Sequence, residues 1–155
     1  MNTINVSKVI FTTLVTSVVL TEAIALFGAQ PILAQTPMIQ MSRNLSSDPL
    51  VVNGTSDKTV PSNCGNITAT PNQVIRVTEA LPYLRVTAKS PVGKTTLLIY
   101  GPGGRFCVMA DSLSDSYPEL SGYWIPGDYS VNVGNLSHKE YSYTIEISQQ
   151  KKPKK

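Results

Sequence analysis

The sequence predicts an all-β protein, in which short antiparallel strands form a sandwich or, less favoured, a barrel. Many short runs of alternating or β-branched residues are separated by Gly- and Pro-containing turns. No segment after residue 35 shows an apolar stripe with a 3.6-residue period. The clearest alternation lies in residues 123–148, where Tyr129, Val131 and Val133 alternate with polar or small residues. We interpret that segment as a β-hairpin with one buried and one solvated face.

Seven or eight strands fit into about 100 residues. The predicted strands are 50–52, a weak strand near residue 67, 74–78, 83–88, 95–100, 105–110, 129–134 and 141–148. Turns are expected at Asn53-Gly54, at residues 91–93 and at residues 101–104. The side chains expected to face inward alternate along two of these strands. They are Leu84, Val86 and Ala88, and then Phe106, Val108 and Ala110.

Three segments resemble the bacterial pre-peptidase C-terminal domain. They are residues 96–111, with the strand TLLIY, the turn GPGG and the closing Ala-Asp, residues 126–134 (PGDYSVNVG), and residues 143–147 (YTIEI). The resemblance spans residues 49–148 and implies a jelly-roll-like β-sandwich of secreted, noncatalytic proteins, some of which bind collagen or calcium. No protease precedes the domain in this sequence, so a part in protease maturation would require a separate partner chain.

The ends of the chain differ in composition from the domain. Residues 1–34 predict a secretory signal peptide, with cleavage after Ala34 or after Ala25. The alternative is a membrane anchor, but Thr, Ser and Glu residues interrupt its apolar run. Residues 35–48 predict a linker, and residues 149–155 a flexible basic tail. We therefore expect a secreted, periplasmic or cell-envelope protein with no stable transmembrane segment after processing.

The positive charge is concentrated in the tail. The chain has a formal net charge of +3, but residues 35–148 contain eight Lys and Arg against nine Asp and Glu, a balance of −1. A nucleic-acid partner is therefore not expected. The basic tail is either a solvated end or a weak attachment to an anionic surface.

The two cysteines, Cys64 and Cys107, predict one disulfide in an exported chain. A pair of buried thiols is the alternative. The bridge would close a loop of about 44 residues and stabilise the fold by roughly 4 kcal/mol. Metal or redox chemistry is not expected, because the chain has no Cys-x-x-Cys spacing and its one histidine, His138, cannot complete a zinc site.

Two catalytic patterns are rejected on their context. Residues 88–95 (AKSPVGKT) match a permissive phosphate-binding loop, but a strand rather than a helix follows, so no helix N-terminus can meet a phosphate. We expect a β-hairpin turn there and no nucleotide. A Ser-His-Asp triad would have to use His138, which lies in a polar loop with no Gly-x-Ser-x-Gly elbow. The sequence therefore predicts a protein that is not an enzyme.

Residues 111–124 form the predicted functional loop, because loops on a rigid sandwich commonly bind ligands. Asp111, Asp115 and Glu119 could supply oxygen ligands to calcium, although their spacing is not that of an EF-hand. The alternative is an ordinary polar loop.

The same loop contains three aromatic residues, Tyr117, Tyr123 and Trp124, that could contact a protein or a glycan. Alternatively, Trp124 fills the core. We expect a secreted noncatalytic binding or accessory domain with an extracellular protein or glycan as partner. A structural envelope protein without a dedicated ligand is the alternative.

Overall fold

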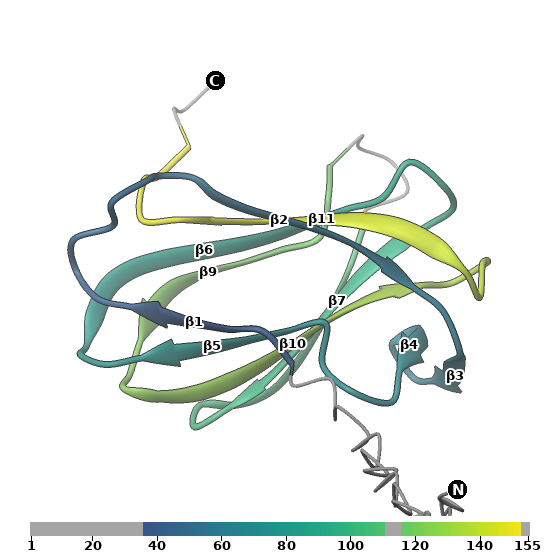
Figure 1. Ribbon diagram of the computed structural model, residues 1–155, viewed down its shortest axis with the longest axis horizontal. Helices are drawn as coiled ribbons and strands as arrows, with labels where there is room; N and C mark the ends of the chain where they lie inside the picture. The colour runs from purple at the N-terminus through teal and green to yellow at the C-terminus, as the bar shows by residue number, and fades with distance from the viewer. Residues whose placement is uncertain (1–35, 111–115, 153–155) are drawn as a thin grey trace, which may run out of the picture. The chain divides into compact units, whose positions relative to one another are not determined.

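The computed structural model describes residues 36–110 and 116–152, in which eleven strands form two sheets packed face to face (Figure 1). The seven-stranded sheet contains β1 (Met38–Met41), β3 (Thr59–Ser62), β4 (Gly65–Thr68), β5 (Gln73–Val77), β7 (Thr95–Gly101), β8 (Gly104–Met109) and β10 (Gly127–Asn135). The four-stranded sheet contains β2 (Leu50–Ser56), β6 (Leu81–Lys89), β9 (Glu119–Trp124) and β11 (Tyr141–Ser148), in the order β2-β11-β6-β9. The predicted all-β sandwich is confirmed.

The core lies between the two sheets and is built by period-two alternation on both. The fully buried apolar side chains include Leu84, Val86 and Ala88 of β6, Leu97 and Ile99 of β7, Val131 and Val133 of β10, and Ile145 and Ile147 of β11. Each of these side chains is at most 1% exposed. The inward-facing residues predicted for residues 83–88 are therefore correct.

The predicted hairpin of residues 123–148 is wrong in its pairing. Strand β10 pairs with β5, β4 and β7, whereas β11 pairs with β2 and β6 in the other sheet. A strand with one inward face alternates in the same way whether its neighbour in sequence lies beside it or across the core. The connection at residues 90–94 behaves likewise, since it joins β6 to β7 across the sandwich and is not a hairpin turn. The β7–β8 turn is a hairpin, with Gly101 paired to Gly104.

All eight predicted strands are present, and three further strands occur where none was predicted. Strand β1 lies within the predicted linker and pairs in parallel with β5, and its Met41 is fully buried. Strand β9 occupies the second half of the predicted 111–124 loop. Strand β3 pairs with β4. All three are four to six residues long, too short for an alternating pattern to be distinct.

Gly54 was predicted to end the strand at residue 52 with a turn, but β2 continues through it to Ser56. Gly54 pairs with Tyr143 of β11, and a Cβ at residue 54 would overlap the Tyr143 hydroxyl and ring. The glycine is required because the tyrosine ring lies across the neighbouring backbone, an arrangement known from other sheets.

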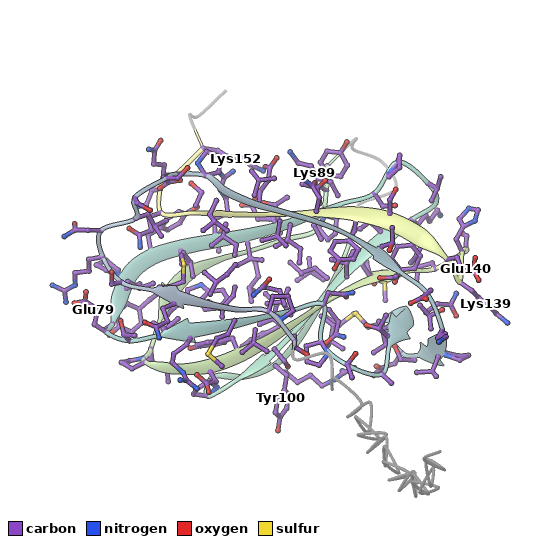
Figure 2. All side chains as sticks on the ribbon, viewed as in Figure 1. Glu79, Lys89, Tyr100, Lys139, Glu140 and Lys152 are labelled. Carbon is purple, nitrogen blue, oxygen red and sulfur yellow. A yellow bond between two sulfur atoms is a disulfide. The ribbon has the colours of Figure 1, made fainter. Side chains whose placement is uncertain are left out.

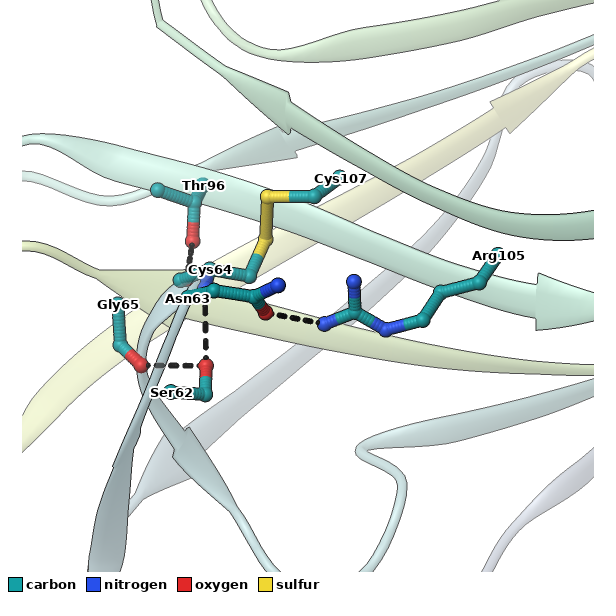
Figure 3. The surroundings of a disulfide bond; sticks show 7 residues. All are labelled: Ser62, Asn63, Cys64, Gly65, Thr96, Arg105 and Cys107. Carbon is teal, nitrogen blue, oxygen red and sulfur yellow. Dashed lines mark hydrogen bonds between the residues drawn. A yellow bond between two sulfur atoms is a disulfide. The ribbon is translucent and has the colours of Figure 1, made fainter.

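The β3–β4 hairpin is fastened to the outer face of the seven-stranded sheet by the Cys64–Cys107 disulfide (Figure 3). The predicted disulfide is confirmed, with Cα atoms 5.8 Å apart. Thr96 Oγ1 donates a hydrogen bond of 2.5 Å to the Cys64 carbonyl, and Asn132 Nδ2 donates to the Thr68 and Thr70 carbonyls at 3.3 and 3.2 Å. This cover explains why Asn132, which was predicted to lie on a solvated face, is only 8% exposed.

Three buried tyrosines make the fold sensitive to alkaline pH. Burial raises the pKa of Tyr129, Tyr141 and Tyr143 above the ordinary value of 10.0. The unfolded chain therefore releases these protons first, so their contribution to stability is complete below pH 10 and is lost as the pH rises through the raised pKa values. We expect the urea midpoint to fall as the pH rises above 10, and to fall less steeply in Tyr143→Phe. Identical pH profiles for the two proteins would contradict this prediction.

Candidate functional site

An apolar groove of about 300 Å³ lies between β8 and β9. We call it the β8–β9 groove. Strand β8 contributes Phe106 and the preceding turn contributes Gly103, while β9 and its exit contribute every residue from Leu120 to Ile125. Tyr129 of β10 completes the lining. Not one of these side chains carries a formal charge at neutral pH.

The groove exists because two sheet edges lie near each other. Strand β8 pairs only with β7, and β9 pairs only with β6, so each is the last described strand on its side of its sheet. The inner face of β9 presents Leu120, Gly122 and Trp124, while Tyr123 is on the outer face. A Cβ built on Gly122 meets no atom within 4 Å, so the inner face has a gap between Leu120 and Trp124. The φ of +149° at Gly122 also disfavours any other residue there.

Trp124 and Tyr129 form a rigid floor. Trp124 Nε1 donates a hydrogen bond of 3.1 Å to the Leu84 carbonyl, and the Tyr129 hydroxyl donates one of 2.9 Å to the Ile125 carbonyl. The two rings lie with centroids 4.5 Å apart and planes at 51°, a favourable tilted contact. Both polar tips are therefore satisfied, and the apolar ring surfaces are held in place.

The rim of the groove is exposed and apolar. Tyr123 is 66% exposed, and Phe106 and Ile125 are each 40% exposed. Phe106 was predicted to face the core. It lies on the inner side of β8 as expected, but β8 is an edge strand, so its side chain borders the groove instead of being covered.

The three predicted aromatic contacts do not form one surface. Trp124 is 4% exposed and belongs to the core cluster, as the alternative interpretation had it. Tyr123 lies on the rim of the groove. Tyr117 lies elsewhere, beneath Lys89, whose Nζ is 5.4 Å from the ring centroid.

Glu119, the described member of the predicted calcium set, is engaged by other groups. Its Oε2 lies 2.5 Å from Lys152 Nζ and 3.9 Å from Arg85 Nη1, and accepts a hydrogen bond of 3.3 Å from Thr87 Oγ1. Asp111 and Asp115 lie outside the described residues. In the part of the chain that the structure describes, no three His, Cys, Asp or Glu side chains are grouped as metal ligands.

The beginning of the basic tail contacts the domain. Lys152 pairs with Glu119, and Lys151 Nζ lies 5.6 Å from the centroid of the Tyr83 ring. Both lysines are nevertheless exposed, and the flexible basic tail of residues 149–155 stays a prediction. Within residues 36–110 and 116–152 there is no helix of the length and hydropathy needed to cross a bilayer.

The residues rejected as catalytic have structural contacts. Strand β7 follows the loop that resembled a phosphate site. His138 lies in the exposed connection after β10, where its backbone N–H and that of Ser137 donate to Asn135 Oδ1 at 2.9 Å each. The Asn135 side chain also donates to the Val92 carbonyl at 2.7 Å and so joins the two connections at this end of the sandwich.

Sequence reasoning missed Phe106, Gly122 and Ile125 as groove residues. Gly122 offered one signal, because a glycine inside a strand commonly marks a bulge or a place where a ligand can approach the backbone.

Comparison with known proteins gives one relative and several similar folds. No family model matches the chain. An uncharacterized protein of Synechococcus elongatus is 30% identical over 118 residues, which cover 74% of this chain and 78% of that protein.

Among solved structures, the pre-peptidase C-terminal domain of collagenase from Bacillus anthracis is similar, with a TM-score of 0.48 and 10% identity over 74% of this chain and 95% of that domain. PliG of Salmonella Typhimurium, a periplasmic inhibitor of g-type lysozyme, has a TM-score of 0.43 and 11% identity over 74% of this chain and 98% of that protein. PliG of Aeromonas hydrophila has a TM-score of 0.40 and 10% identity over 72% and 95%. The pre-peptidase C-terminal domain is also the family that segments of the sequence resemble.

Proposed function

This chain belongs to the same family as the uncharacterized Synechococcus elongatus protein, and we propose that it is a noncatalytic extracytoplasmic binding module whose ligand site is the β8–β9 groove. The Cys64–Cys107 disulfide supports the location, because such bonds persist in oxidising compartments.

One observation supports the binding role above the others. The β8–β9 groove combines an aromatic floor, held by hydrogen bonds from Trp124 and Tyr129, with an exposed apolar rim at Phe106, Tyr123 and Ile125. Concave, largely apolar and pre-formed sites are typical of ligand binding. Exposed aromatic side chains next to such a site are typical of the residues that dominate binding energies.

The groove can be tested by a double substitution on its rim. We expect Tyr123→Ser/Ile125→Ser to reduce retention of the purified domain by an envelope fraction of its source organism at least tenfold, because both side chains lose their apolar contact area. The measurement is co-sedimentation of labelled domain over a range of concentrations.

Tyr100→Ser is the matched control. Tyr100 is 61% exposed, close to the value for Tyr123, but projects from the outer face of the seven-stranded sheet away from the groove (Figure 2). Equal retention of the rim variant, the control and the unmodified domain would contradict the proposal and would leave a structural envelope protein without a dedicated ligand.

A further inference from the structure

We propose that the occupant of the β8–β9 groove is an extended, uncharged polypeptide segment that adds as a further strand to the free edge of β9. This inference rests on the proposed function and specifies its ligand class. Strand addition gives affinity through main-chain hydrogen bonds and specificity through alternate side chains.

The backbone of β9 has hydrogen-bonding groups at its outer edge that no described strand satisfies. The Ala88 N–H donates to the Pro118 carbonyl at 3.1 Å, and antiparallel pairs alternate between bonded and non-bonded. The pairs Val86–Leu120 and Leu84–Gly122 therefore point their backbone groups at each other. The N–H and carbonyl groups of Ser121 consequently face the free edge. Those of Tyr123 do so too, because the register shift between Leu81 and Leu84 places the extra residue in β6 and leaves the alternation of β9 unbroken.

The groove runs along this edge and not over one face of the strand. Its lining includes both the inward residues Leu120 and Trp124 and the outward residues Ser121 and Tyr123. The gap at Gly122 lies midway along the strand and can accept one side chain of an added strand. A peptide bonded to Ser121 and Tyr123 would direct alternate side chains into the groove, between Phe106 and the Trp124 floor.

The charges around the groove define the segment that fits. No lining residue is charged, and Glu119, at the start of β9, already pairs with Lys152 and Arg85. A charged side chain entering the groove would lose its hydration without gaining a partner, which is costly. The complementary segment is therefore uncharged, with two or three apolar side chains at alternate positions, as many as about 300 Å³ can hold.

A second copy of the chain is a poor occupant of the same edge. The exposed parts of the rim side chains Phe106, Tyr123 and Ile125 together present a contact area on the order of 300 Å². A stable dimer requires roughly 800 Å² from each partner. A short segment of another protein suits this area better than a folded copy.

Synthetic seven-residue peptides test the proposal directly. In each peptide, threonine alternates with one of four residues: valine, isoleucine, phenylalanine or tyrosine. Binding is measured from the change in fluorescence emission of Trp124, the one tryptophan of the chain. For the tightest peptide, N-methylation of the residues that face β9 should weaken binding at least tenfold, whereas N-methylation of the intervening residues should change it less than twofold. Ser121→Pro, which removes an outward N–H, should also weaken binding tenfold, and Ser121→Ala should not.

The N-methylated peptides leave the protein unchanged, so the test stands even if Ser121→Pro fails to fold. The proposal is overturned if no peptide binds, if N-methylation has the same effect in both registers, if neutral oligosaccharides and not peptides alter the Trp124 emission, or if binding induces only dimers. If the envelope fraction retains the unmodified domain but not Tyr123→Ser/Ile125→Ser, and no peptide binds, only strand addition is refuted. If the envelope fraction retains both proteins equally, the proposed function itself is refuted.

Discussion

The double substitution Cys64→Ala/Cys107→Ala lowers the free energy of unfolding by about 4 kcal/mol. This is the loop-closure entropy that the unfolded chain regains when two residues 43 positions apart are no longer joined. The loss is large relative to the stability of about 5–15 kcal/mol that is typical of a domain. The double substitution acts mainly on the unfolded state, while in the folded state it removes one of several links that hold the β3–β4 hairpin over Asn132. Urea unfolding followed by circular dichroism measures it.

Arg105→Ala is the control for this prediction. Arg105 Nη2 donates to Asn63 Oδ1 at 2.5 Å, a second connection between the β3–β4 turn and β8, but one that is exposed (Figure 3). We expect that substitution to cost less than about 1 kcal/mol. A disulfide-free variant within about 1 kcal/mol of the unmodified protein would show that the bridge does not stabilise the fold.

Trp124→Ala lowers the unfolding free energy by about 3–5 kcal/mol, because it empties a large volume next to Tyr129 and leaves the Leu84 carbonyl without its indole donor. The adjacent substitution Tyr123→Ala is the matched control. Tyr123 is 66% exposed where Trp124 is 4% exposed, so we expect a cost of less than about 1 kcal/mol.

Circular dichroism in urea compares the two variants, since the chain has no other tryptophan to report unfolding. Equal losses for the two substitutions would mean that Trp124 does not act as a core residue. A small loss for Trp124→Ala with a large loss of ligand binding would instead favour the interpretation of Trp124 as an exposed contact.

The strands were predictable because residues that point into the core alternate with residues that point outward. Leu84, Val86 and Ala88, for example, are the inward residues of one strand. Their pairing was not, because alternation identifies an inward face but not the neighbour beside it. Residues 129–133 and 141–147 alternate as a hairpin would, yet they lie in opposite sheets.

The groove could not be predicted, because it arises from tertiary arrangement. Phe106 and Trp124 are separated by 18 positions in the sequence and meet at one groove only because β8 and β9 end different sheets. An apolar residue on an edge strand has the same local pattern as one in the core. Cys64 and Cys107 could be paired from the sequence because no third cysteine competes.

The crossing of the chain between the two sheets has a consequence for how the protein folds. Of the ten connections between described strands, only β3–β4, β4–β5 and β7–β8 remain within one sheet. Most backbone pairing therefore joins segments that are distant in sequence, such as β2 with β11, and such high contact order slows folding. Because strands of the two sheets alternate along the chain and β2 must find β11, we expect the domain to fold as one slow cooperative unit.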